Sequence, residues 1–207
     1  MKSTNKILAL AASAMLVASA NATWYTSEAA FLAATVGPNY TEDFNNFTSF
    51  GNPLDGSQTT WSAPGGNGFG FDAAASLGLW SNIGALSTNV ADDPITLTLT
   101  GNPTTAFGAR VANTDVDGGF IPGQVTLNLS NGANTVVDVT GGEQFIGWAD
   151  STVTITTATF TASSAGIANW VQLDHIIQGT ATPVPEPATL SVLALGALAA
   201  IRRRKAK

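Results

Sequence analysis

Apolar and polar residues alternate with a period of two in several segments in the middle of the chain. Ile95, Leu97 and Leu99 alternate with threonines, and residues 125–130 repeat this order with valine and leucine against Thr, Asn and Ser. Successive side chains of a β-strand point to opposite faces, so this pattern predicts strands with one buried face. Further strands, about nine in all, are expected at 40–44, 68–73, 105–112, 135–139, 144–148, 153–162 and 169–177.

Turn residues separate these segments, as in Asp117-Gly118-Gly119, Asn131-Gly132 and Gly141-Gly142. No helical pattern lies between consecutive strands, which favours antiparallel pairing over a parallel α/β sheet. Between Ile155 and Phe160 the apolar positions change phase, which predicts a β-bulge at 156–157. The pattern therefore predicts an all-β fold, an antiparallel β-sandwich that is jelly-roll-like.

One short helix is expected before the first of these strands. Thr26 or Ser27 would cap it over residues 28–34, with Glu28 near the positive end of the helix dipole. Gly37-Pro38 is expected to end it.

The first 22 residues have the three parts of a secretory signal peptide. Lys2 and Lys6 precede an apolar stretch at 7–17, and Ala20-Asn21-Ala22 forms a small-residue cleavage site. We therefore expect export and cleavage by signal peptidase, with Ala20 and Ala22 as the cleavage signal and Thr23 as the first mature residue.

The C-terminal segment 182–207 also has three parts. Pro185-Glu186-Pro187 forms an extended strip, an apolar helix of about residues 188–201 follows, and a basic tail of residues 202–207 begins with Arg202, Arg203 and Arg204. Fourteen residues of helix are about 21 Å long, less than the bilayer hydrocarbon core of about 30 Å. The arginines predict a membrane stop with the C-terminus in the cytoplasm. Residues 23–181 would then form the exported β-sandwich domain.

This tail resembles the PEP-CTERM sorting domain over about residues 183–207. The resemblance implies a substrate of exosortase, with Pro185, Glu186 and Pro187 as recognition residues. Such proteins are anchored transiently in the inner membrane and then released to the cell surface or the extracellular matrix, often in bacteria that make exopolysaccharide. A plain C-terminal anchor with a chance Pro-Glu-Pro is the competing interpretation.

Charge is distributed unevenly along the chain. All fourteen acidic residues lie between Glu28 and Glu186, where Arg110 is the only basic residue. Nucleic-acid binding draws its affinity from lysine and arginine, so a nucleic-acid partner is not expected. Such a surface suits divalent cations or sugars, or serves only to keep the domain soluble. The chain has no cysteine, which excludes disulfides and thiolate metal sites.

Two carboxylates, Asp115 and Asp117, precede a glycine-rich turn. Their spacing fits a hard cation such as Ca²⁺, the one cofactor that the sequence points to, although the distal glutamate of a calcium loop is missing. The alternative is a solvated hairpin turn. A second oxygen site would pair Glu42 or Asp43 with Asp174 in the last strand.

Two of the five tryptophans, Trp61 and Trp80, lie in or near glycine-rich loops. They are the candidates for stacking on sugar rings, whereas Trp148 and Trp170 lie in apolar strands and are expected to fill the interior.

Catalytic patterns are weak. His175 is the single histidine, and no Gly-x-Ser-x-Gly turn accompanies it. The sequence therefore favours a non-enzymatic surface or matrix protein with a structural or adhesive role beside exopolysaccharide. The alternatives are a carbohydrate-binding module, with or without calcium, and a secreted hydrolase.

Overall fold

Thirteen strands form two antiparallel sheets in the part of the chain that the computed structural model describes, residues 22–183. The first sheet has seven strands, in the order β1-β11-β8-β13-β6-β5, with β2 also paired to β13. Its strands are β1 (Thr23–Tyr25), β2 (Thr35–Glu42), β5 (Leu79–Asn82), β6 (Ala85–Thr88), β8 (Ala106–Thr114), β11 (Gln144–Ala149) and β13 (Trp170–Ala181).

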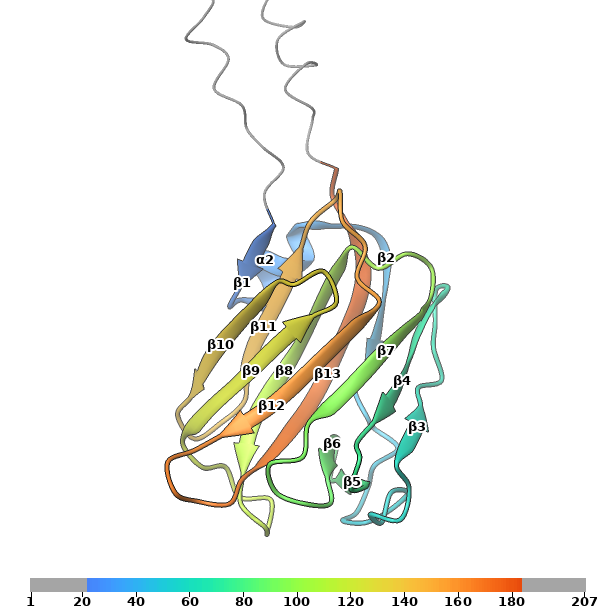
Figure 1. Ribbon diagram of the computed structural model, residues 1–207. Helices are drawn as coiled ribbons and strands as arrows, with labels where there is room; N and C mark the ends of the chain where they lie inside the picture. Colours follow the sequence, from blue (N-terminus) through green and yellow to red (C-terminus); the bar gives the residue numbers. More distant parts are fainter. Residues whose placement is uncertain (1–21, 184–207) are drawn as a thin grey trace, which may run out of the picture. The chain divides into compact units, whose positions relative to one another are not determined.

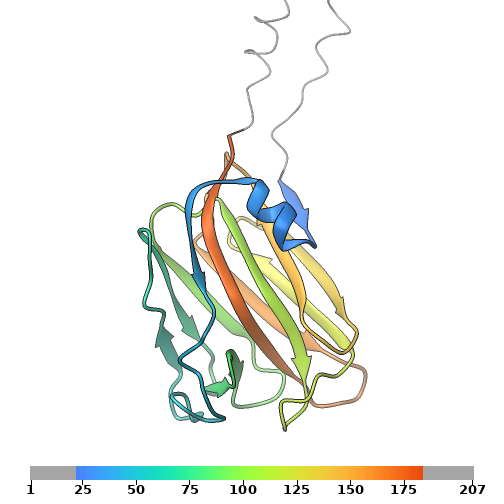
Figure 2. The ribbon, with the colours of Figure 1, turned by 180° about the vertical axis from the view of Figure 1, so that it is seen from behind.

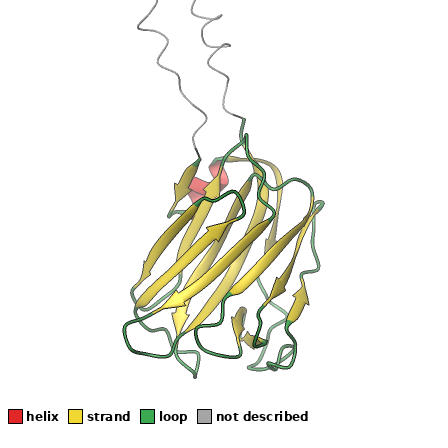
Figure 3. Cartoon of the chain, viewed as in Figure 1, coloured by secondary structure: helices red, strands yellow, loops and turns green. Residues whose placement is uncertain are grey.

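The second sheet has six strands, in the order β10-β9-β12-β7-β4-β3. Its strands are β3 (Thr60–Ser62), β4 (Phe69–Ala74), β7 (Ile95–Gly101), β9 (Gly123–Leu129), β10 (Asn134–Val139) and β12 (Thr157–Ser163). Figure 1 shows this sheet in front of the first, and Figure 3 shows how little helix accompanies them.

The core lies between the two sheets. Ile95, Leu97 and Leu127 point inward from the second sheet and are fully buried, while the polar residues between them face outward. Phe107 of the first sheet meets Phe160 of the second across the interior, with 6.1 Å between ring centroids. Burial of each such side chain stabilises the fold by about 1.5–3 kcal/mol. The predicted antiparallel β-sandwich is confirmed, and its jelly-roll connectivity stays a prediction.

The single helix of the described chain, α2 (Glu28–Ala33), packs on the outer face of the first sheet (Figure 2). Its buried Phe31 lies over Gly108 of β8 and Gly147 of β11, which are opposite each other in the ladder. A Cβ at Gly147 would lie 2.7 Å from the Phe31 ring, so glycine is needed for this close approach. Ser27 caps the helix by accepting a hydrogen bond from the Ala30 amide, as predicted.

Both ends of the described chain lie at the same end of the sandwich. The Thr182 amide donates to the Ala34 carbonyl beside the helix, and β1 begins nearby (Figure 1). Strands β5 and β6 and the loop after β8 lie at the opposite end. Ligands bound there would therefore lie far from the points where the chain enters and leaves the domain.

Three sequence predictions differ from the structure. Gly37-Pro38 lies inside β2 and does not end the helix, which stops at Ala33. No register shift occurs at 156–157, because β12 begins at Thr157. The register shifts lie in β13, between Asp174 and Ile177 against β8 and between Gln178 and Thr180 against β2. Four short strands, β1, β3, β5 and β6, were not predicted, because segments of three or four residues are too short to show a period.

Residues 1–21 of the predicted signal peptide, with Ala20, lie outside the described residues, as do Pro185, Glu186, Pro187, the apolar helix and the basic tail; Ala22 is the first described residue. Between residues 22 and 183 the structure has no helix that is long and apolar enough to cross a membrane.

Candidate functional site

A pocket of about 350 Å³ lies at the end of the sandwich remote from the chain ends. Residues of β5, β6, the end of β8 and the start of β13 line it, together with residues of the loops that follow β2 and β8. Three aromatic residues, Phe50, Trp80 and Trp170, and two acidic residues, Asp115 and Asp117, are among those that line it. Its size falls in the range of pockets that bind small molecules.

The strand register brings these residues together. Trp80 of β5 pairs with Ser87 of β6, which pairs with Gln172 of β13, so the three form one row across the first sheet. Trp170 pairs with Thr114 at the end of β8, directly before the loop that holds the two aspartates. Residues 79–89, 114–118 and 170 are therefore neighbours in space although they are far apart in sequence.

Hydrogen bonds hold the polar floor of the pocket in place. The amide Nδ2 of Asn82 donates to Oε1 of Gln172 at 2.5 Å, and the hydroxyl of Ser87 donates to the Val171 carbonyl at 2.9 Å. Asn82, Ser87 and Gln172 are all buried. Because buried polar groups with partners resist rearrangement, this part of the pocket is preformed.

The aromatic walls differ in exposure. Phe50 is 54% exposed, whereas Trp80 and Trp170 are half-buried. Gly51 lies against the Trp80 ring, where an added Cβ would be 3.0 Å from Cη2. Gly118 lies against the Phe50 ring, where an added Cβ would be 3.2 Å from Cε1. The two glycines thus let the loops approach the rings closely and fix the orientation of the aromatic walls.

Asp115 and Asp117 have different roles in the loop after β8. One oxygen of Asp115 accepts hydrogen bonds from the amides of Asp117 at 3.0 Å and Gly119 at 2.7 Å, which closes the turn. Asp117 is exposed, and its carboxylate has no hydrogen bond or ion pair with any described residue. Asp115 therefore shapes the loop, and Asp117 offers a free carboxylate to solvent.

A calcium ion at Asp115 and Asp117 stays a prediction. Within residues 22–183, no three acidic or histidine side chains gather in an arrangement suited to a metal ion. The two aspartates could supply carboxylate oxygens, but further ligands would have to be water, backbone carbonyls or a bound molecule.

The two tryptophans chosen from sequence lie in different places. Trp80 lines the pocket, and its stacking on a sugar stays a prediction. Trp61 of β3 is half-buried and packs against Phe44 and Phe47, with ring centroids 5.5 and 5.4 Å away. Its stacking on a sugar stays a prediction, and nothing in the structure brings it to the pocket.

Two pocket residues were missed from sequence. Trp170 was expected in the core, but the inward residues of β13 near its start are Val171 and Leu173, so Trp170 faces outward. The buried tryptophan is Trp148, as expected. Phe50 stands in an irregular loop, where the only available signal was an aromatic residue directly before Gly51-Asn52-Pro53.

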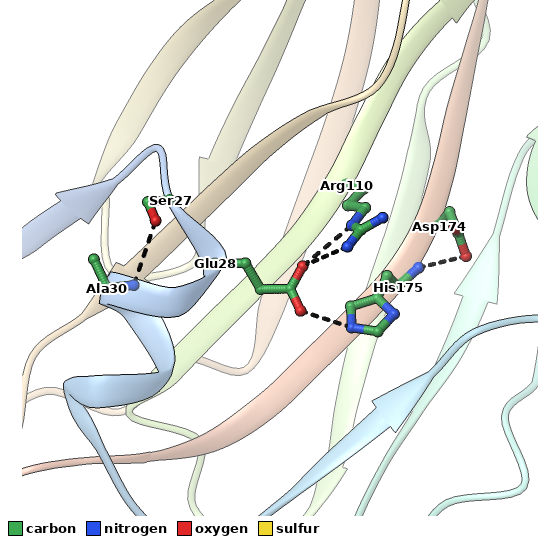
Figure 4. A network of polar contacts seen from close by, with 6 residues as sticks. All are labelled: Ser27, Glu28, Ala30, Arg110, Asp174 and His175. Carbon is green, nitrogen blue, oxygen red and sulfur yellow. Dashed lines mark hydrogen bonds and ion pairs between the residues drawn. The ribbon is translucent and has the colours of Figure 1, made fainter.

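A second polar cluster lies on the outer face of the first sheet, beside α2 (Figure 4). Oε2 of Glu28 accepts from Nε of Arg110 at 3.1 Å and from Nη2 at 2.9 Å, while Nε2 of His175 lies 2.9 Å from Oε1. His175 has a left-handed backbone, with φ of 49°, and its amide donates to Asp174 at 2.6 Å. The strained residue sits in the bulge of β13 and turns the imidazole toward the helix.

Burial and charge shift the pKa values of three carboxyls in this cluster. Burial alone would raise the pKa of Glu28, but the hydrogen bonds and charges of Arg110 and His175 outweigh it and lower that pKa. Burial, followed by the repulsion of Asp174, raises the pKa of Glu143. Burial also raises the pKa of Asp174. Because both oxygens of Glu28 are engaged, this cluster serves to tie the helix to the sheet.

The predicted proximity of Glu42 or Asp43 to Asp174 follows from the pairing of β2 with β13. Glu42 is buried and accepts hydrogen bonds from the Tyr40 hydroxyl at 2.7 Å and the Phe44 amide at 2.9 Å. It is therefore committed to holding the chain at the end of β2, and an oxygen site there stays a prediction.

Replacing Glu28 by glutamine should reduce stability in a pH-dependent way. A depressed carboxyl pKa stabilises the fold above the unfolded-state pKa, and this contribution is lost as the pH falls through the folded-state pKa. We expect Glu28→Gln to lower the free energy of unfolding by about 1 kcal/mol near neutral pH, the upper range for a solvent-accessible pair. Urea unfolding at neutral and acidic pH should show the difference shrinking in acid.

The matched control is Glu143→Gln, because its folded pKa is raised. When the pKa of a carboxyl is higher in the folded state than in the unfolded state, the folded state becomes less stable as the pH rises from the unfolded-state pKa to the folded-state pKa. This variant should therefore be as stable as the parent or more stable near neutral pH. Equal losses in both variants, at both pH values, would contradict the assigned charge interactions.

The fold and the pocket define a class, a β-sandwich domain with a pocket at one end. Residues 183–205 match the model of the PEP-CTERM protein-sorting motif. The chain therefore carries a PEP-CTERM sorting motif at its C-terminal end, which confirms the resemblance seen in its sequence and indicates an exported protein that exosortase processes.

No curated protein sequence is significantly similar to this chain. Among solved structures, an alanine variant of the family 29 carbohydrate-binding module CBM29-2 is similar at a TM-score of 0.39 and 13% identity, covering 62% of this chain and 99% of that one. Another family 29 carbohydrate-binding module is similar at a TM-score of 0.37 and 10% sequence identity, over 70% of this chain and 91% of that one. A family two carbohydrate esterase from Cellvibrio japonicus is similar at a TM-score of 0.36 and 10% sequence identity, over 71% of this chain and 37% of that one. Similarity at this level carries no statement about a ligand.

Proposed function

We propose that the exported sandwich domain is a non-enzymatic adhesive module that binds a polysaccharide of the extracellular matrix in the pocket beside Trp80. The observation that carries this proposal is the meeting of three aromatic side chains and two carboxylates in one preformed pocket. Aromatic faces bind the apolar faces of sugar rings, and carboxylates and amides bind their hydroxyls.

The position of the pocket supports an adhesive role. The described chain leaves the sandwich at Thr182, at the end opposite the pocket. We propose that signal peptidase cuts after Ala22 and that the helix of about residues 188–201 holds the protein in the inner membrane, with the basic tail in the cytoplasm. The segment that would join the domain to this helix therefore does not start beside the pocket.

We propose that the domain is not an enzyme. His175 lies beside α2 and outside the pocket, where both oxygens of Glu28 bind Arg110 and His175 and hold the helix on the sheet. The pocket itself contains no histidine among its described residues. Its acids and aromatic rings are suited to binding.

Phe50→Ala is the variant that tests polysaccharide binding. Phe50 is exposed, so its removal should leave the fold intact, yet it takes away one aromatic wall. We expect the association constant for a matrix polysaccharide to fall about tenfold, which corresponds to about 1.4 kcal/mol. Titration calorimetry against a panel of bacterial exopolysaccharides measures this constant.

Val136→Ala is the matched control. Val136 is 52% exposed on the edge strand β10 of the other sheet, close to the 54% of Phe50. Its removal should leave binding unchanged. If both variants bind like the parent, or if no polysaccharide binds, the proposed function is wrong.

A further inference from the structure

The polar wall of the pocket has charge of one sign only. Asp115 and Asp117 contribute two carboxylates, and none of the described residues that line the pocket is basic. The basic side chains between positions 23 and 187 are Arg110 and His175, and both are bound to Glu28 on the sheet beside α2. No cation of this domain therefore neutralises the aspartates at the pocket.

This charge discriminates between classes of sugar. Uronate or sulfated polymers would meet two like charges in the pocket and a strongly acidic domain around it. Neutral sugars would gain hydrogen bonds and stacking but no charge interaction. A sugar with an ammonium group would gain both, because opposite charges attract at the short distances that a pocket imposes.

The arrangement of the side chains suits an ammonium group. Asp117 is exposed and has no partner among the described residues, so binding would break no existing hydrogen bond. One oxygen of Asp115 closes the turn, which leaves the other without a described partner. An ammonium has three donors to share between two carboxylates, and the faces of Trp80 and Trp170 attract cations as well.

We infer that the pocket selects amino sugars with a free amine, as they occur in a partly de-N-acetylated hexosamine polysaccharide. The inference rests on the proposed function, since it names the class of sugar that the same pocket binds. It predicts that the amine, more than the ring, determines which polymer the domain retains.

The experiment compares two glucosamine oligosaccharides of equal length, one with free amines and one fully N-acetylated. Calorimetric titrations would use the purified full chain in a detergent without sugars, with EDTA, at a pH where the sugar amine is protonated. We expect the free-amine oligosaccharide to bind about tenfold or more tightly than the acetylated one, and added salt to weaken it.

Variants assign this preference to the pocket. Asp117→Asn removes the free carboxylate without breaking a contact and should reduce the preference for the free amine to about threefold or less. Asp138→Asn on β10 is the control, because it removes the same charge from an exposed position on the other sheet. It should change binding by less than about twofold. Equal unfolding midpoints of the three proteins would show that folding is preserved.

Each alternative result has a distinct meaning. If the acetylated oligosaccharide binds as tightly and Phe50→Ala weakens both, the pocket binds sugars but the inference is wrong. If Asp138→Asn weakens binding as much as Asp117→Asn, the attraction is that of the whole acidic domain, and the inference is again wrong. If binding needs added calcium in place of EDTA, the aspartates bind a metal and not an amine. If Phe50→Ala changes neither titration, the proposed function itself fails.

Discussion

Phe160→Ala should lower the free energy of unfolding by about 3–5 kcal/mol, the range measured for loss of a large aromatic side chain in a core. Phe160 lies in the middle of β12, is fully buried and contacts Phe107 of the opposite sheet. Its removal leaves a cavity between two sheets whose spacing is fixed by many other side chains. Domains have free energies of unfolding of about 5–15 kcal/mol, so this substitution would remove a large part of that free energy. Equilibrium urea unfolding measures the change.

Thr161→Ala is the control for this result. Thr161 is the next residue of the same strand, and its side chain points to the outer face, where it is half-buried. We expect a change of about 0.5 kcal/mol or less. Similar losses at positions 160 and 161 would mean that the two faces of β12 are not inner and outer as described.

Replacing Pro185, Glu186 and Pro187 together by alanine should abolish exosortase-dependent processing. The motif lies within the matched residues 183–205, and the sequence predicts an extended backbone there because proline fixes φ, which suits binding in an enzyme groove. In a host that has exosortase, the parent chain should lose its C-terminal mass, and the variant should keep it. Intact-mass measurements of the membrane and medium fractions distinguish the two.

Val184→Ala, which leaves the three motif residues in place, is the matched control and should be processed like the parent. A parent chain that keeps its tail in hosts with and without exosortase would contradict sorting by this motif. The tail would then act as a plain membrane anchor.

The long strands of the sandwich could be predicted from sequence because each has one buried face. In β9, Val125, Leu127 and Leu129 alternate with polar residues, and the observed burial has the same period. β8 is buried on both faces, since α2 covers part of its outer side, and a run of small residues near Gly108 replaces the alternation. The bulge at His175 had no such signal, because its position depends on pairing with β8.

The candidate site could be predicted only in part. The sequence indicates Asp115 and Asp117 by their spacing before a turn, and Trp80 separately, as an aromatic residue near glycines. Their meeting in one pocket depends on the pairing of β5 with β6, of β6 with β13 and of β13 with β8. Such contacts join segments that are far apart in sequence, and no local pattern encodes them.

The face of the sheet on which Trp170 lies could not be predicted from sequence either. An aromatic residue at the start of an apolar strand can lie on the inner or the outer face, and pairing with Thr114 decides which. A shift of one residue would have buried Trp170 and exposed Val171.

The central claim is that a matrix polysaccharide binds in the pocket at the far end of the sandwich. The most direct measurement is an NMR titration of the ¹⁵N-labelled protein with the polysaccharide that binds it. The account predicts shifts of the indole signals of Trp80 and Trp170 and of the amides of Phe50 and residues 115–118, with the buried Trp148 unchanged. Shifts confined to Trp61, or to the sheet face around Arg110 and His175, would contradict it.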